Sequence, residues 1–440
     1  MLLSLDHQYF NRAQGAFLRK SPKKRNNSLK NRQQISKFWN PKRKIDLRTG
    51  SYTISGDFDH NLSGADVIKN KRKVGFIKYA GFSHANSSLL DVLKLEFPNL
   101  EFVVIALEDL ISKNDFLALV NCYMLYGRKI KLDREKISRY YFRTPYMFQK
   151  IRKVLQAKYE SSDFIFTFQT QSFFDGSLSG IPHFVYTDHT HLENLRYPDF
   201  DVSNLFHRKW IALEQSVYAN AALNFAMSTN IATSMIKDYG LEEDQVLTVG
   251  CGSNVRVSQN VSIPKSKYKD QNILFAGVDW ERKGGSVLVE AFKIVQQTFK
   301  DATLTIVGTA PKIPLRNCEV VGKVPLSEME AYYQKASLFV LPTNLEPFGF
   351  VFLEAMASKT PVIGTNIGAL PDLIHDGKNG YLVSPKDVEQ LATAIKCCLA
   401  NPEKMTAFGA YGHQLFWNQY NWEVTGKKIK MAILEQMDVL

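Results

Sequence analysis

The sequence of 440 residues has few cysteines and no long hydrophobic run. Its five cysteines are odd in number and scattered, which excludes a disulfide framework and a zinc-ligand spacing and favours a reducing compartment. No apolar run approaches the roughly 18 residues that a membrane-spanning helix needs. The first ten residues lack a continuous apolar stretch after a basic start, so we do not expect a signal peptide.

The net charge of +12 belongs to one end of the chain. Residues 1–73 hold 17 Lys and Arg against 5 Asp and Glu, whereas the rest of the chain carries 38 residues of each sign. Because this stretch has few apolar residues, we expect a flexible basic extension. It either contacts an anionic partner or is solvated without a specific role.

A second basic segment, residues 128–158, holds 11 Lys and Arg against two acids and is interleaved with Tyr and Phe. Basic residues beside aromatic ones suit an anionic membrane surface. They would equally suit a polyanionic acceptor, or a solvated helix with buried aromatic side chains. We expect a cytoplasmic protein that can lie at the inner face of a membrane through residues 1–73 and 128–158. Nucleic acid is not an expected partner.

Two series of strands and helices alternate along the chain. The first series predicts strands at residues 74–79, 101–107, 164–168 and 183–186. The second predicts strands at residues 273–276 and 303–307, among others. Between the two series, residues 250–270 are rich in Ser, Asn, Lys and Pro, as expected for an interdomain linker. Such alternation is typical of βαβ units in parallel sheets.

We therefore predict an α/β fold with two Rossmann-like domains that face a central cleft. The expected parts are the basic extension 1–73, an N-terminal domain 74–255, a C-terminal domain 271–415, and a helix 416–440 that crosses back to the N-terminal domain. The last segment, residues 402–437, is expected to be helical and carries several aromatic residues. Its crossing back to the N-terminal domain is what the resemblance of the chain to a known family implies.

The stretch L-P-T-N-L-E-P-F-G-F-V-F-L-E-A-M-A-S, residues 341–358, combines a strand end, a loop and a helix start. Glu346 lies in the predicted loop and Glu354 lies in the predicted helix. Ligands of open α/β sheets bind at the carboxyl ends of strands, and the bare amide groups of a helix start favour anions. Taken alone, the pattern would also suit a plain strand–helix connection with two solvated glutamates.

The segments that follow make the pattern specific. E-P-F-G-F-V-F-L-E is followed by P-V-I-G-T-N-I-G-A-L-P-D and then by D-G-K-N-G-Y-L-V. This order, over residues 273–400, resembles the donor-binding half of glycosyltransferase family 4, a retaining group with the GT-B fold that is also called glycosyl transferases group 1. The resemblance implies transfer of a hexose-type sugar from a nucleotide-diphosphate sugar to a hydroxyl of a glycan or lipid-linked acceptor, as in polysaccharide or glycolipid synthesis.

The resemblance also implies roles for the residues of the central stretch. Glu346 would contact the hydroxyl groups of the donor sugar, and Glu354 would bind the ribose of the nucleotide. The backbone N–H groups of Phe348, Gly349 and Phe350 would serve the sugar and the diphosphate. These roles agree with chemistry, since carboxylates accept hydrogen bonds from paired hydroxyls and helix-start amides suit phosphate oxygens.

The segment F-A-G-V-D-W-E-R-K-G-G, which contains Gly277, resembles the first strand–loop of the family's donor domain. The family typically places an Arg and a Lys there against the leaving diphosphate. Lys283 matches the Lys, whereas the Arg position is occupied by Val278. Arg282 either compensates or is an exposed charge. No D-x-D motif stands out, so we expect cations and amide dipoles rather than a metal at the leaving group, and no cofactor.

Further residues are assigned by the same resemblance. Val324 would meet the nucleotide base through its backbone. His189 ends the strand H-F-V-Y-T-D-H-T-H and would orient the acceptor, with His191 as the alternative. These histidines and Asp188 supply too few ligands for a metal site. Gly81 occupies the place of the family's glycine-rich loop, where two glycines are common.

Two other functions stay open at the level of sequence. A nucleotide-sugar epimerase would need further acid–base carboxylates in the N-terminal half, and the sequence does not show them. A degenerate nucleotide-sugar-binding or scaffold protein, with a basic arm for membrane or nucleic acid, is favoured by Val278 and by the sparse loop at Gly81. The presence of Glu346, Glu354 and Lys283 together favours the enzyme.

Overall fold

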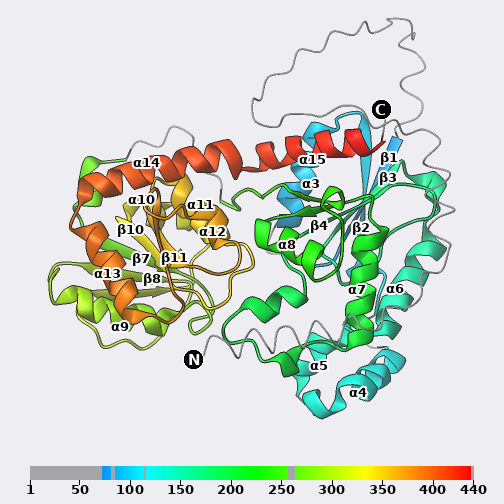
Figure 1. Cartoon of the computed structure of the whole chain (residues 1–440), viewed down its shortest axis with the longest axis horizontal. Coiled ribbons are helices and arrows are strands. Elements are labelled where there is room, and N and C mark those ends of the chain that lie inside the picture. The colour runs from blue at the N-terminus through cyan, green and yellow to red at the C-terminus, as the bar shows by residue number, and fades with distance from the viewer. Residues whose placement is uncertain (1–71, 81–84, 113–114, 132, 256–262, 438–440) are drawn as a thin grey trace, which may run out of the picture. The chain divides into compact units, whose positions relative to one another are not determined.

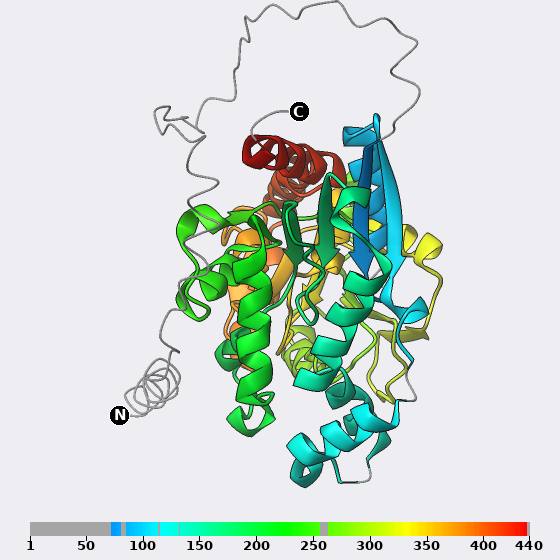
Figure 2. The same cartoon turned by 90° about the vertical axis from the view of Figure 1, so that its right-hand side faces the viewer.

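The computed structural model describes residues 72–80, 85–112, 115–131, 133–255 and 263–437, which belong to one compact unit. The expectations for Gly81 and for the basic extension, apart from Arg72 and Lys73, therefore lie outside the described residues. Figure 1 and Figure 2 show the described elements in two views. Within them, no helix is both long enough and apolar enough to cross a membrane.

The N-terminal lobe, residues 72–255, is built on a parallel six-stranded sheet of order β2-β1-β3-β4-β5-β6. Its central strands are buried at every position, as expected for a parallel sheet that helices cover on both faces. The strands are β1 (Arg72–Lys78), β2 (Leu100–Ala106), β3 (Phe166–Thr170), β4 (His183–Thr187), β5 (Leu223–Ala226) and β6 (Val246–Thr248). The helices are α3 (Ala85–Glu96), α4 (Phe116–Ile130), α5 (Arg134–Tyr141), α6 (Pro145–Lys158), α7 (Arg208–Asn220) and α8 (Thr229–Lys237).

The C-terminal lobe, residues 263–419, contains a second parallel sheet of order β12-β11-β10-β7-β8-β9. The strands are β7 (Asn272–Ala276), β8 (Thr303–Val307), β9 (Cys318–Gly322), β10 (Leu338–Leu341), β11 (Val362–Thr365) and β12 (Gly380–Val383). The helices are α9 (Gly285–Gln296), α10 (Met329–Lys335), α11 (Phe350–Ala357), α12 (Leu370–Leu373), α13 (Val388–Leu399) and α14 (Pro402–Gln419). The two sheets confirm the predicted α/β fold with two Rossmann-like domains.

The chain ends in α15 (Trp422–Met437), which lies against α3 of the N-terminal lobe (Figure 1). The break before it falls at Tyr420–Asn421, where the Asn421 side chain accepts a hydrogen bond from the Val424 N–H (3.0 Å) and caps α15. The Trp422 indole donates to the Ser253 carbonyl (3.0 Å). The last helical segment thus passes from one lobe to the other as two helices.

Lys267 lies buried in a short 3-10 helix, Lys265–Tyr268, that leads into β7. Its ammonium donates to the carbonyls of Tyr333 (3.1 Å) and Ser358 (3.0 Å) and to the Thr360 hydroxyl (2.8 Å). These acceptors lie at the carboxyl ends of α10 and α11, which favour a cation. Burial lowers the pKa of Lys267 to about 7. One side chain therefore connects the entry of the second sheet to two helix ends.

We predict that Lys267→Met destabilises the protein by roughly 2–4 kcal/mol, because it leaves buried acceptors without a donor. The midpoint of thermal unfolding should fall by several degrees. Lys269→Met, at an exposed position two residues later, is the matched control and should leave the midpoint unchanged. Equal midpoints for the two variants would contradict this account of Lys267.

Candidate functional site

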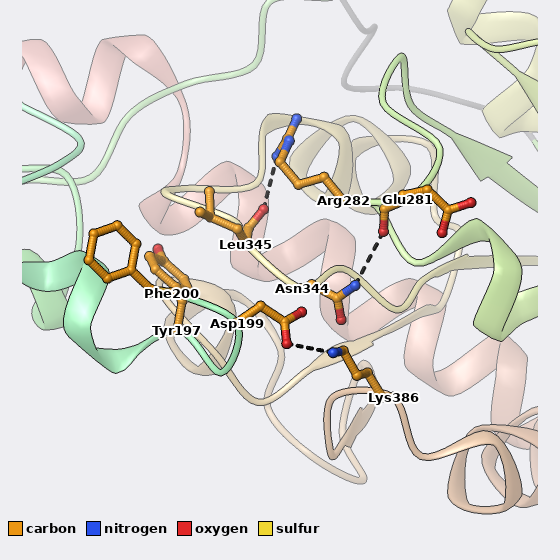
Figure 3. A pocket seen from close by; sticks show the side chains of 8 residues that line it. All are labelled: Tyr197, Asp199, Phe200, Glu281, Arg282, Asn344, Leu345 and Lys386. Atoms are coloured by element: carbon orange, nitrogen blue, oxygen red, sulfur yellow. Dashed lines mark hydrogen bonds and ion pairs between the residues drawn. The ribbon is translucent and has the colours of Figure 1, made fainter. Parts of the chain in front are cut away.

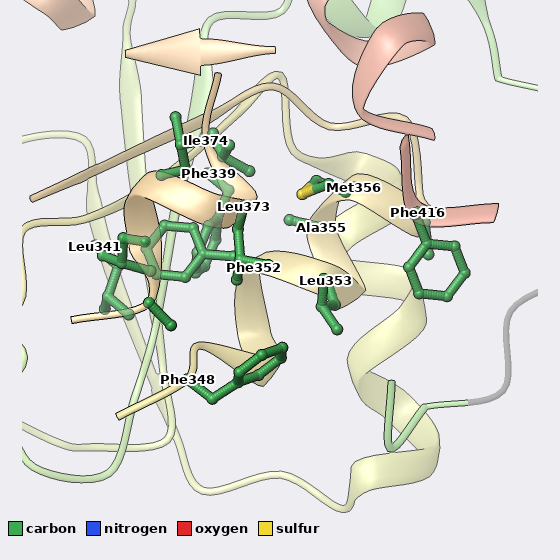
Figure 4. Close-up of a cluster of buried hydrophobic side chains, with 14 of the residues drawn as sticks. Phe339, Leu341, Phe348, Phe352, Leu353, Ala355, Met356, Leu373, Ile374 and Phe416 are labelled. Atoms are coloured by element: carbon green, nitrogen blue, oxygen red, sulfur yellow. The ribbon is translucent and has the colours of Figure 1, made fainter. Parts of the chain in front are cut away.

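The loop and helix that follow β10 present backbone amides at the carboxyl edge of the second sheet. The start of α11 is fixed by apolar side chains, with Phe348 and Phe352 buried in the cluster that Figure 4 shows. Gly349 precedes the helix with φ +106°, and a Cβ there would lie 3.0 Å from Leu370. Among the described residues, the amides of Phe348, Gly349 and Phe350 donate no hydrogen bond. They are available to a ligand.

Lys283 and Glu346 form an ion pair below this helix start. Lys283 comes from the turn between β7 and α9, and Glu346 comes from the loop between β10 and α11. Both side chains are about nine-tenths buried, so each charge compensates the other in a region poor in water. Gly284 lets the two loops meet, because its φ is +73° and a Cβ there would lie 1.9 Å from the Pro342 carbonyl oxygen.

Glu346 also contacts the N-terminal lobe. The Tyr197 hydroxyl donates to the Glu346 carbonyl (3.2 Å). The Gly-Ala-Leu-Pro-Asp segment approaches the same carbonyl so closely that a Cβ on Gly368 would lie 2.1 Å from its oxygen. Burial raises the pKa of Asp188 to about 6, and the charge of Glu346 raises it further in the same direction. Residues of both lobes therefore meet at Glu346.

His189 follows β4 and is held by Asn194, whose amide lies 2.8 Å from Nε2. Burial lowers the pKa of His189 to about 4, so the imidazole is neutral at pH 7. If the Asn194 amide donates to Nε2, the proton lies on Nδ1. Nδ1 is buried and has no hydrogen-bond partner within the described part of the chain. The ring faces Tyr197, with 6.4 Å between the ring centroids.

His191 does not share this freedom. Its Nε2 accepts from the Phe206 N–H (2.7 Å), and its ring stacks on Phe206 at 4.0 Å. Its side chain is therefore committed to the packing of the N-terminal lobe. Where the structure describes the chain, no group of three or more His, Cys, Asp or Glu side chains is placed to hold a metal ion.

Glu354 lies inside α11 and is 4% exposed. It accepts a hydrogen bond from the Tyr333 hydroxyl (2.8 Å), and burial raises the pKa of its carboxyl to about 7. Glu346 thus precedes the helix start and Glu354 lies within α11, as the sequence predicts. The partner Tyr333, from α10, has no recognisable signal in the sequence.

The residues of the loop after β7 do not all point into the same site. Arg282 donates to Asp279 (3.2 Å) and to the Leu345 carbonyl (2.9 Å), so its guanidinium is not in the ion pair of Lys283. Gly277 leaves room for the Lys283 side chain, because a Cβ there would lie 3.0 Å from Lys283 Cγ. Val278, at the family's Arg position, is 72% exposed. Val324 is half-buried just after β9.

Arg282 lines a cavity of about 420 Å³ between the lobes. Figure 3 shows its walls, where Lys386 of the C-terminal lobe pairs with Asp199 of the N-terminal lobe. The remaining lining residues are Tyr197, Phe200, Glu281, Asn344 and Leu345. Tyr197 is thus shared between this cavity and Glu346, a link that no sequence pattern indicates.

Comparison with known proteins identifies relatives of the C-terminal lobe. Residues 270–401 match the family model described as Glycosyl transferases group 1. The GDP-mannose-dependent alpha-(1-6)-phosphatidylinositol monomannoside mannosyltransferase of Mycolicibacterium smegmatis is 28% identical over 166 residues, which cover 34% of this chain and 44% of that protein. Alpha-maltose-1-phosphate synthase of the same species is 27% identical over 282 residues, or 56% of this chain and 70% of that protein.

Among solved structures, sucrose-phosphate synthase from Thermosynechococcus elongatus superposes with a TM-score of 0.60 at 19% identity, over 84% of this chain and 100% of that chain. The alignment with the mannosyltransferase spans less than half of that relative's length. Residues 270–401 are therefore a domain of the glycosyl transferases group 1 family, and the chain that carries them has the GT-B fold.

Proposed function

We propose that this protein is a retaining glycosyltransferase of family 4. It moves a hexose-type sugar from a nucleotide-diphosphate sugar to a hydroxyl of a glycan or lipid-linked acceptor. The observation that carries the proposal is the buried Lys283–Glu346 pair beside the unused amides at the start of α11. The matched family and the relatives named above, which include a mannosyltransferase, support it.

The donor half of the reaction follows from charge. Lys283 and the amides of Phe348, Gly349 and Phe350 form a positive site for the leaving diphosphate. Glu346 accepts hydrogen bonds from hydroxyls of the donor sugar, and Glu354 accepts from the ribose. In the ligand-free protein Lys283 is paired with Glu346. Binding of the donor gives the cation a second anionic partner without moving it from the site.

The acceptor half uses the N-terminal lobe. His189 is neutral at pH 7, and Nδ1, when it carries the proton, donates a hydrogen bond to the acceptor or the sugar rather than taking a proton. The bond between the anomeric carbon and the phosphate oxygen breaks, and the acceptor oxygen attacks on the same face. The acceptor proton passes to the leaving phosphate. Closure of the lobes excludes water from this step.

The protein binds peripherally to a membrane surface and reaches its acceptor there. Helix α4 exposes apolar side chains, with Phe116 74%, Leu117 59% and Met124 78% exposed, and Val120 and Tyr123 beside them. The basic segment 128–158 begins in the last turn of this helix. In both views α4 and α5 lie at the end of the lobe away from α15 (Figures 1 and 2). An apolar face with basic neighbours suits an anionic bilayer.

We expect nucleotide release and sugar transfer from one member of a panel of labelled nucleotide-diphosphate hexoses. Mass spectrometry of the products identifies the donor, and the anomeric configuration of the product tests retention. An epimerase would convert a donor without any acceptor. A scaffold protein would bind donors without turnover, and that result across the whole panel would refute the proposal.

Lys283→Ala and Glu346→Ala should each lower kcat by two to three orders of magnitude, because each removes a charge that contacts the donor. Lys293→Ala, at an exposed position on α9, is the control and should transfer at the normal rate. Circular dichroism and thermal unfolding should check that each variant folds, since each leaves one buried charge unpaired. Near-normal transfer by both variants would overturn the assignment of the site.

Replacing Phe116, Leu117 and Met124 together by Ser should weaken binding to vesicles that contain phosphatidylserine by about tenfold or more, since it removes three exposed apolar contacts. Flotation of the protein with the vesicles measures binding. A control with Ser at Leu95, Leu326 and Met431, which are exposed on other elements, should float like the native protein. Unchanged flotation of the α4 variant would exclude this surface.

A further inference from the structure

The guanidinium of Arg143 lies among three aromatic rings of the N-terminal lobe. Its Cζ is 4.5 Å from the ring centroid of Phe173, 5.4 Å from that of Trp210 and 5.7 Å from that of Phe206. Cation–π contacts of this kind hold the group in place and stabilise its charge. They use none of its five N–H donors.

No hydrogen bond or ion pair joins that guanidinium to any residue that the structure describes. The bonds of Arg143 are made by its backbone, with its N–H donating to Tyr140 (2.9 Å) and its carbonyl accepting from Tyr126 (2.6 Å). The residue as a whole is half-buried rather than covered. A cation in such a place has no ion-pair partner and is only partly exposed to water, which is unfavourable.

Two acids of this lobe, Glu214 and Glu108, are hydrogen-bonded to other partners. Glu214 accepts hydrogen bonds from Ser172 (2.9 Å) and from the Tyr239 hydroxyl. Glu108 is paired with Lys78 (2.8 Å). Burial also raises the pKa of Glu214 to about 7, so part of its charge is lost at neutral pH. The charge of Glu214 acts on Arg143, whose pKa it raises against the effect of burial, but neither acid forms an ion pair with the guanidinium.

Arg143 lies at the carboxyl edge of the N-terminal sheet, where ligands of open α/β sheets bind. Tyr79 directly follows β1, and its ring contacts that of Phe173, which follows β3. After β4, the pKa of His189 is lowered by burial and also by the charge of Arg143. Phe206, whose ring contacts the guanidinium, also stacks on His191, so Arg143 lies near the turn that carries His189, the histidine that the proposed reaction places beside the acceptor.

Besides the acid Glu214, several cationic side chains act on this position. The pKa of His191 is lowered by burial first, and then by the neighbouring His189, Arg143, Arg139 and Lys129. Burial lowers the pKa of Arg143 itself to about 10, so it stays protonated at neutral pH. A dianion gains more than a monoanion in such a field, and a guanidinium fork matches the oxygens of a phosphate.

We propose that Arg143 binds a phosphate group carried by the acceptor, so that the acceptor hydroxyl is held beside His189. The proposal deepens the proposed function, on which its second test rests, by naming the class of acceptor. The phosphate belongs either to a lipid headgroup or to a soluble sugar phosphate. Arg143 acts as an acceptor-binding residue, since it does not meet the reacting atoms.

The first test needs no catalysis. Inorganic phosphate is titrated into the full-length protein by calorimetry at constant ionic strength. Arg143→Gln should bind about 10- to 100-fold more weakly than the native protein, whereas Lys209→Gln, an exposed cation on the neighbouring α7, should bind normally. Lys283→Gln removes the donor-side cation and should keep the Arg143 site. Equal binding by Arg143→Gln and the native protein, or no binding by the native protein, overturns the proposal.

Arg143→Lys keeps the charge and the aromatic contacts but loses the fork. It should bind phosphate with intermediate affinity, and it replaces Arg143→Gln as the decisive variant if the latter does not fold. Binding by Arg143→Lys equal to that of the native protein would show that the fork is not used and would contradict a phosphate contact of this geometry.

The second test measures transfer, with the donor that the panel identifies. Glucose 6-phosphate is compared with glucose and with glucuronate, and vesicles that contain phosphatidylinositol are compared with vesicles that contain an uncharged glycolipid. In at least one of these two comparisons, kcat/KM for the phosphorylated acceptor should be at least about tenfold higher than for the acceptor without phosphate. Arg143→Gln should abolish that preference. Equal use of glucose, or of glucuronate, refutes the phosphate assignment. Failure of every donor refutes the proposed function instead, while calorimetry still decides whether Arg143 binds phosphate.

Discussion

The site depends on one buried ion pair, Lys283 with Glu346. Each side chain comes from a loop after a different strand, so the pair fixes the distance between two strand ends of the C-terminal sheet. Either charge alone would be costly in this position, whereas together they remain stable until a ligand arrives. Glycines at positions 284 and 368 are required because backbone oxygens occupy the space that a Cβ would take. Close backbone packing and charge pairing thus both determine the positions of Lys283 and Glu346.

Much of the fold could be predicted because its signals are local. Alternating apolar runs indicate parallel strands, and the eight-residue spacing of Glu346 and Glu354 places them around a helix start. The sequence patterns do not predict β9 or β12, which are short and largely half-buried. The partners Tyr197, Tyr333 and Asn194 were also missed. Tyr197 meets a residue 149 positions away, and such contacts leave no periodic trace.

The two lobes differ in how far their residues can be interpreted. The family model covers residues 270–401, the range that contains Glu346, Glu354 and Lys283. The candidate residues of the N-terminal lobe lie outside that range, and their proposed roles rest on local chemistry. His189 has an unused nitrogen, whereas His191 is bonded to the Phe206 backbone. This distinction rests on hydrogen bonds, since both histidines occupy the same short turn of sequence.

Helix α4 has a further consequence for handling the protein. Its inner face packs through Ala118, Cys122, Tyr126 and Ile130, yet its outer face is also apolar over the first two turns. In a solution without lipid, this outer face of one copy can be covered by the same face of another copy. Association between copies should therefore increase with concentration and decrease when a mild detergent is added. The size measured in solution will therefore depend on whether lipid or detergent covers the outer face of α4, and not on the specific assembly of the protein alone.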